Sequence, residues 1–112
     1  PIIMNVIDDA KKQAFKNSAY GIIEAAQLSN SMDILHGKYQ VLIFTYDENG
    51  ESSNVEGKKL EYKGKRPQSG QVHVRIDGKV AIAIHDGKYC AEKGFEDEEV
   101  VVTEKDKNEC FL

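Results

Sequence analysis

The N-terminal quarter of the chain carries apolar residues at helical spacing, in two neighbouring rows that repeat every three or four positions. The pattern extends over about twice the length of an average globular helix. A chain of 112 residues suffices for one domain, so a helix of this length is expected to project beyond its own core at one end. Ser-Asn-Ser at 29–31 favours local side-chain hydrogen bonds and predicts the helix end there. The rows are Ile3, Ile7, Ala10, Ala14, Ile22, Ala25 and Leu28, and beside them Phe15, Ala19, Ile22 and Ala26.

The N-terminal end of this helix is the expected overhang, because its first turns are apolar around more than one face. Exposed apolar surface of this kind marks an interface or an insertion site, and ordinary core is the alternative. Asp8 and Lys12 stand four residues apart, the spacing of a helix-supporting ion pair, with ion pairs between subunits as the alternative. The apolar residues are Ile2, Ile3, Met4, Val6 and Ile7.

The rest of the chain predicts short antiparallel strands. Residues 39–46, YQVLIFTY, are rich in β-branched and aromatic side chains and end at a turn signature, Asp-Glu-Asn-Gly at 47–50. Residues 50–57 are polar and predict an exposed loop, and 58–62 are a candidate short strand. A last strand is expected at 100–102, with its first and third valines on one face.

Two Asp-Gly turns in QVHVRIDGKVAIAIHDGKYC link three further strands in a meander. A two-residue turn at Asp77-Gly78 would put the valines before and after it on opposite faces. A three-residue turn with Gly78 left-handed puts Val72, Val74, Val80 and Ile82 on one face, and we prefer it. The same reasoning at the second turn pairs Ile82 with Cys90 and predicts that Cys90 points toward the core.

The chain has two cysteines, Cys90 and Cys110, without the ligand spacing of a zinc site. A disulfide between them is predicted, closing a loop of about 20 residues and implying an oxidising, extracytoplasmic compartment. The alternative is a pair of reduced cysteines in a cytosolic protein.

Composition excludes several classes of function. Hydrophobic residues make up 40% and charged residues 30%, and no apolar run reaches the roughly 20 residues of a membrane-spanning helix. The net charge of −4 comes from residues 89–112, and the chain has two arginines, Arg66 and Arg75. It therefore lacks the basic surface that binds a phosphate backbone, and nucleic acid is not expected as the main ligand. No catalytic motif or phosphate-binding loop is present, so we predict neither enzyme activity nor a cofactor.

Metal binding has weak support in the sequence. His36, His73 and His85 are scattered and are predicted to be surface or edge residues. Four consecutive acids supply hard oxygen atoms of the kind that calcium prefers, but without the ordered spacing of a calcium loop, and a solvated face is the favoured interpretation. They are Glu96, Asp97, Glu98 and Glu99.

In three features the chain resembles the superfamily of type IV pilins and type II secretion pseudopilins. These are a long helix with an apolar start, an antiparallel sheet on the later half of that helix, and a C-terminal loop closed by a disulfide. PIIMNVIDDAKKQAFKNSAYGIIEAA looks like the part of the pilin helix that follows the transmembrane segment, whose final proline matches Pro1. DGKVAIAIHDGKYCAEKGFEDEEVVVTEKDKNEC is similar to the C-terminal region of prepilin-like proteins from Gram-positive bacteria. The family's leader, cleavage site, glutamate and apolar membrane segment have no counterpart here, so we expect the membrane half of the helix to be missing from this sequence.

The resemblance implies one α+β pilin-like domain over 1–112, with a long helix at 1–31 whose N-terminal part projects, and a sheet and loops at 32–112. It further implies a structural subunit of a type IV pilus-like surface filament that is anchored in the membrane before assembly and presents its loops for adhesion or motility. Its partners would be copies of itself or related pilins, the membrane, and a host surface or substrate at the loops. The expected filament-interface residues are Ile2, Ile3, Val6, Ile7, Asp8 and Lys12.

Two alternatives stay open at this point. One is a pseudopilin of a type II secretion or DNA-uptake machine. The other belongs to a different class, a soluble secreted binding or inhibitor module of the cystatin type, which also sets one helix against an antiparallel sheet.

Overall fold

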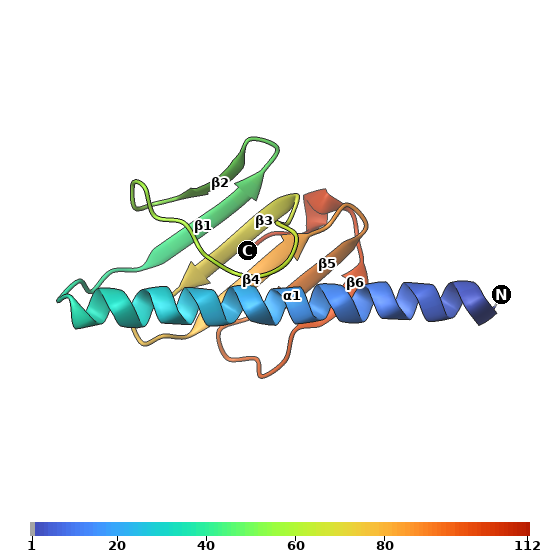
Figure 1. The fold of residues 1–112 in the computed structure, drawn as a ribbon, viewed down its shortest axis with the longest axis horizontal. Coiled ribbons are helices and arrows are strands. Elements are labelled where there is room, and N and C mark those ends of the chain that lie inside the picture. Colours follow the sequence, from blue (N-terminus) through green and yellow to red (C-terminus); the bar gives the residue numbers. More distant parts are fainter. Residues whose placement is uncertain (1) are drawn as a thin grey trace.

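One long helix lies across one face of an antiparallel sheet (Figure 1). The computed structural model describes residues 2–112, and their side chains from Ile7 onward. Within that range the fold is α+β, as expected, and the sheet order is β2-β1-β3-β4-β5-β6. The elements are α1 (Ile2–Leu35), β1 (Leu42–Asp47), β2 (Gly50–Ser53), β3 (Ser69–Val74), β4 (Val80–His85), β5 (Tyr89–Lys93), β6 (Val101–Glu104) and the short 3-10 helix η1 (Lys107–Glu109).

Helix α1 continues past its predicted end at 29–31. Asn30 does not bond to its own backbone; its Nδ2 donates to the carbonyl oxygen of Ile76, 3.5 Å away, in the β3–β4 loop. The helix closes at Gly37, whose φ of 77° is the left-handed conformation that favours glycine. There Gly37 N donates to Ile34 O and Lys38 N donates to Asp33 O, the hydrogen-bond pair of a Schellman motif.

The N-terminal half of the sheet departs from expectation in two places. Residues 50–53 form strand β2, which pairs with β1 around the predicted Asp47–Gly50 turn, whereas the candidate strand at 58–62 is absent from the described sheet. Leu60 is buried there in the main core, and its backbone N–H donates to Glu51 Oε2 at 2.7 Å. A side-chain acceptor thus replaces the strand ladder that the sequence suggested.

The β3–β4 hairpin has the predicted form. Val74 pairs with Val80 and Val72 pairs with Ile82, so all four side chains lie on the core face. Gly78 has a φ of 89°, as the three-residue turn requires.

The β4–β5 hairpin has a different register from the one predicted. Cys90 pairs with His85 and not with Ile82. The turn lies over Asp86–Tyr89, where Asp86 N donates to Tyr89 O at 3.2 Å and Asp86 Oδ1 accepts the backbone N–H of Tyr89 at 2.7 Å. Since neighbouring strand residues point to opposite faces, Cys90 lies on the face away from α1, although it is fully buried.

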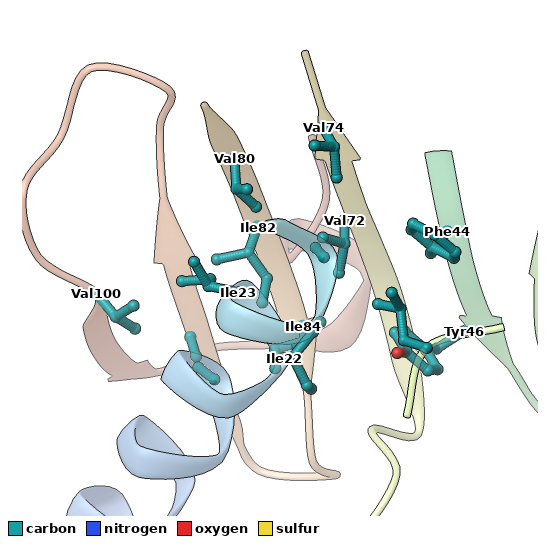
Figure 2. Packing of buried hydrophobic residues seen from close by; sticks show 14 of the residues in the cluster. Ile22, Ile23, Phe44, Tyr46, Val72, Val74, Val80, Ile82, Ile84 and Val100 are labelled. Carbon is teal, nitrogen blue, oxygen red and sulfur yellow. The ribbon is translucent and has the colours of Figure 1, made fainter. Parts of the chain in front are cut away.

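The main core lies between α1 and the facing side of the sheet (Figure 2). Only one of the two predicted helix rows takes part, because a helix lying on a flat sheet buries one stripe. Ile7, Ala10, Ala14 and Leu28 of the other row are exposed, and for Ile7 this agrees with the expected overhang. The helix contributes Phe15, Ala19, Ile22, Ile23 and Ala26, and the strands contribute Leu42, Phe44, Tyr46, Val72, Val74, Val80, Ile82, Ile84, Tyr89 and Ala91.

Candidate functional site

The N-terminal part of α1 extends past the sheet (Figure 1). At 1.5 Å per residue its 34 residues are about 51 Å long, in a molecule that measures 54 × 29 × 23 Å. The first helix residue in the core is Phe15. Ile7, one of the predicted interface residues, is 49% exposed. The side chains of Ile2, Ile3 and Val6, also predicted there, lie outside the described residues.

Asp8 and Lys12 lie toward the sheet and contact the turn between β4 and β5. Asp8 Oδ1 is 3.8 Å from Lys88 Nζ, and Lys12 Nζ lies 5.6 Å from the centre of the Tyr89 ring. The Tyr89 side chain, ahead of Asp8, raises the pKa of Lys88 above its ordinary value. Ile7 is on the other side of the helix, so the structure does not bring these three predicted interface residues together.

The face of α1 opposite the core carries a row of exposed or partly exposed, uncharged residues that continues to the C-terminal end of the helix. Among its large members Leu28 is 64% exposed, Met32 48% and Leu35 80%. We call this row the outer seam. Its members are Ile7, Ala10, Ala14, Asn17, Gly21, Leu28, Met32 and Leu35.

The predicted rows included Ile7, Ala10, Ala14 and Leu28 of the outer seam and stopped short of Met32 and Leu35. The available signal was the pair of apolar rows itself. The two rows are neighbours around the helix, and a flat sheet centred on one of them leaves the outer side of the other uncovered. One of them had to remain free for another contact or for solvent.

The disulfide between Cys90 and Cys110 is present, with a Cα–Cα distance of 5.8 Å, as predicted. The two half-cystines pack with Ala83 in a small buried cluster on the face of the sheet away from α1. The bond therefore fastens the C-terminal segment to the back of the sheet and not to the helix side.

His85 is 4% exposed, which corrects its assignment to the surface or an edge. Its Nδ1 accepts the backbone N–H of Gly87 at 3.0 Å, and its Nε2 donates to the carbonyl oxygen of Lys105. Lys105 Nζ in turn lies 2.7 Å from Glu92 Oε1. These contacts hold the chain between β6 and η1 against β4 and β5. His85 therefore helps to fix the position of the loop that the disulfide closes.

A polar cleft of about 1140 Å³ lies at the end of the sheet beside this loop. Its lining carries both acidic and basic side chains, and the ring nitrogens of His85 are both hydrogen-bonded. The lining residues are Asp47, Glu48, Lys65, Arg66, Pro67, Gln68, Ser69, His85, Gly87, Lys105, Asp106, Lys107 and Asn108.

The acidic segment 96–99 does not assemble a calcium site in the described part of the chain. Glu96 is engaged by Lys79 at 2.8 Å and Arg75 at 3.6 Å, and Lys79, ahead of Arg75, lowers the pKa of Glu96. Asp97 Oδ2 accepts the backbone N–H of Gly94 at 2.9 Å. Across residues whose side chains are described, no three His, Cys, Asp or Glu groups converge to hold a metal ion.

Among residues 2–112, no helix combines the length and the hydropathy that a bilayer-spanning segment needs. Comparisons of the chain with protein-family models, with curated proteins and with solved structures each return no match.

Proposed function

We propose that this chain is a structural subunit of a type IV pilus-like surface filament, which assembles through its N-terminal helix and presents the sheet and loops outward. The observation that carries the proposal is the long helix that leaves the sheet at its N-terminal end with the sequence IIMNVI. An apolar helix start without a sheet beneath it has a physical reason to pack against lipid or against neighbouring subunits.

The disulfide supports an extracytoplasmic location for the domain. Disulfides persist in oxidising compartments and at cell surfaces, and the Cys90–Cys110 bond closes the C-terminal loop on the back of the sheet. A filament subunit would have this loop, and the polar cleft beside it, on its outward side. Adhesion or motility would then depend on these surfaces, because loops held by a rigid scaffold carry most contacts with partners.

The proposal also assigns a division of labour to the two ends of the molecule. The helix start would supply the contact with neighbouring subunits, and the sheet end that carries 47–50, 65–69 and 105–108 would supply the contact with a host surface or substrate. A pseudopilin of a secretion or uptake machine would share this division between the two ends. It would differ from a pilin because long surface filaments would not contain the chain.

The decisive experiment places Ile7→Lys in the source cell and counts surface filaments by electron microscopy with an antibody against this chain. Ile7 is half-exposed, so the folded domain should tolerate lysine, whereas a buried charge between subunits should abolish filaments. Gln13→Lys is the matched control, because Gln13 is exposed on the same helix and gains the same charge.

Wild-type filaments that label with the antibody, lost in Ile7→Lys and kept in Gln13→Lys, would support the proposal. Wild-type cells without labelled filaments would overturn it, and a labelled secretion complex in their place would indicate a pseudopilin. A secreted monomer in the medium would favour the soluble binding module.

A further inference from the structure

The outer seam has the spacing of a helix–helix contact. Its members follow one another at steps of three or four residues, with one step of seven between Gly21 and Leu28, where the exposed Glu24 borders the line. None of them is charged. In Figure 1 the sheet lies behind α1 and no other element passes over the helix. The described chain therefore leaves this line without a partner of its own.

Side-chain size along the seam is graded. Ala10 and Ala14 lie in the N-terminal half, and Leu28 and Met32 lie in the C-terminal half. Gly21 stands midway, fourteen residues from either end of the seam. A β-carbon added at Gly21 would meet no other atom within 4 Å, so nothing in its own chain requires glycine there. A close approach by another helix does give a reason for it.

We propose that the outer seam packs against the outer seam of a second copy of this chain, antiparallel, with the two helices crossing at Gly21. This alignment sets Ala10 opposite Met32 and Ala14 opposite Leu28, so each of these contacts joins a small side chain to a large one. Ile7 meets Leu35 at both ends. Asn17, the polar member, lies opposite Ala25, which is partly buried beside the seam.

A parallel pairing of the same seams fits poorly. It would set Leu28 and Met32 against copies of themselves at one end and Ala10 and Ala14 against copies of themselves at the other. The helices would be forced apart where the large residues meet and would leave voids where the small ones meet. The antiparallel pairing keeps a nearly constant distance between the axes, and it places the two sheets on the outside.

The area of the contact predicts a weak dimer. The seam from Ile7 to Leu35 is about 42 Å long, and a stripe of about 100° on a helix removes roughly 500 Å² per copy from solvent. The total of roughly 1,000 Å² is at the lower limit of specific interfaces. A two-fold contact closes on itself, whereas filament growth needs an open head-to-tail contact, so this dimer is distinct from a filament. The dimer does not depend on the proposed function.

Sedimentation equilibrium of the purified chain at about 10 µM to 1 mM tests for the dimer. Leu28→Lys should weaken association by at least about tenfold, because it replaces an apolar contact with a charged side chain that pairs with Glu24 of its own helix and must lose water in the interface. Gln27→Lys is the matched control: Gln27 is exposed, one residue from Leu28 and off the seam, and should leave the dissociation constant within about twofold. A wild-type chain that stays monomeric throughout would overturn the proposal.

Gly21→Leu separates association from folding. Its β-carbon meets nothing in the chain and leucine favours helix, so the melting temperature of the monomer should not fall. The dimer should weaken by at least about tenfold, because two leucine side chains would occupy the helix crossing. Dimerisation of Gly21→Leu at wild-type strength would refute the crossing at Gly21.

Orientation is tested with Ala10→Cys and Met32→Cys chains and a short bismaleimide, which reacts with free thiols and spares the Cys90–Cys110 bond. A mixture of the two variants should cross-link in pairs of one chain of each kind. Ala10→Cys alone should not, since its two sites would lie about 33 Å apart along the helices. Efficient cross-linking of Ala10→Cys to itself would show a parallel contact and overturn the proposal. Ile7 belongs to both proposed contacts, so these experiments leave Ile7 unchanged and filament loss in Ile7→Lys cells is not used to test the dimer.

Discussion

Removal of the disulfide is expected to cost this domain about 3 kcal/mol of stability. The bond joins residues 20 apart in the sequence. By the chain-entropy relation, a loop of this length removes about 11 cal/mol/K from the unfolded chain, which is about 3.3 kcal/mol at 25 °C. An entropy of unfolding of about 2.1 cal/mol/K per residue over 112 residues then gives a fall of about 14 °C in melting temperature.

Three samples separate the loop term from the loss of buried atoms. They are the oxidised wild type, the wild type reduced under non-denaturing conditions, and the double variant Cys90→Ala/Cys110→Ala. The reduced wild type keeps both sulfur atoms, so it reports the loop term. The double variant also empties space in the buried Ala83 cluster and should lose about 1 kcal/mol more.

Urea unfolding followed by circular dichroism measures both quantities that the reasoning predicts. The free energy of unfolding should fall by the amount given above, and the m-value should rise, because an unfolded chain without the cross-link exposes more surface. A loss below about 1 kcal/mol in the reduced wild type, with an unchanged m-value, would refute the loop-entropy account.

Three further predictions concern the core, the sheet and a histidine. Ile22→Ala should cost about 2–5 kcal/mol in urea unfolding because Ile22 is fully buried, whereas Leu28→Ala on the outer seam should cost under about 0.5 kcal/mol. Gly70→Ala should cost more than about 3 kcal/mol in thermal unfolding, since Gly70 has a φ of 120° and its added β-carbon would lie 2.1 Å from the carbonyl oxygen of Ala83. Burial lowers the pKa of His73, so the unfolded chain takes up a proton at a higher pH than the folded chain does. The stability of the fold should therefore decline as the pH falls from about 6.5 through the folded pKa. NMR titration of the His73 ring measures the folded midpoint.

Each of these predictions has an outcome that contradicts it. Equal losses for Ile22→Ala and Leu28→Ala would mean that both helix rows are buried. A Gly70→Ala protein with wild-type stability would mean that β3 and β4 do not approach closely at that position. A titration midpoint at about 6.5 for His73 would mean no pH dependence from this group, and a midpoint above that value would reverse the predicted sign.

The helix and the β3–β4 hairpin were predictable because their determinants are local. Apolar spacing every three or four residues identifies a helix wherever the chain goes afterwards, and Gly78 supplies the positive φ of a three-residue turn. The missed helix end shows the limit of the same reasoning. Asn30 was expected to end α1, but it bonds to Ile76, 46 residues away in the sequence, and the left-handed Gly37 ends the helix instead.

The candidate site was predicted in part. Ile7 is exposed as expected, and the disulfide was identified from a cysteine count, since two cysteines allow only one pairing within a chain. The burial of His85 had no signal in the sequence, because it depends on the return of Lys105 from across the disulfide loop.

By itself, the sequence determined that this chain has one long helix, a set of short antiparallel strands and a disulfide, because spacing, turn residues and cysteine number act through neighbours in the chain. Tertiary structure alone decided which helix row is buried and which face of the sheet holds Cys90. The first depends on where the sheet packs against the helix. The second depends on turn length, because a strand alternates its faces with every residue and a change of one position exchanges them.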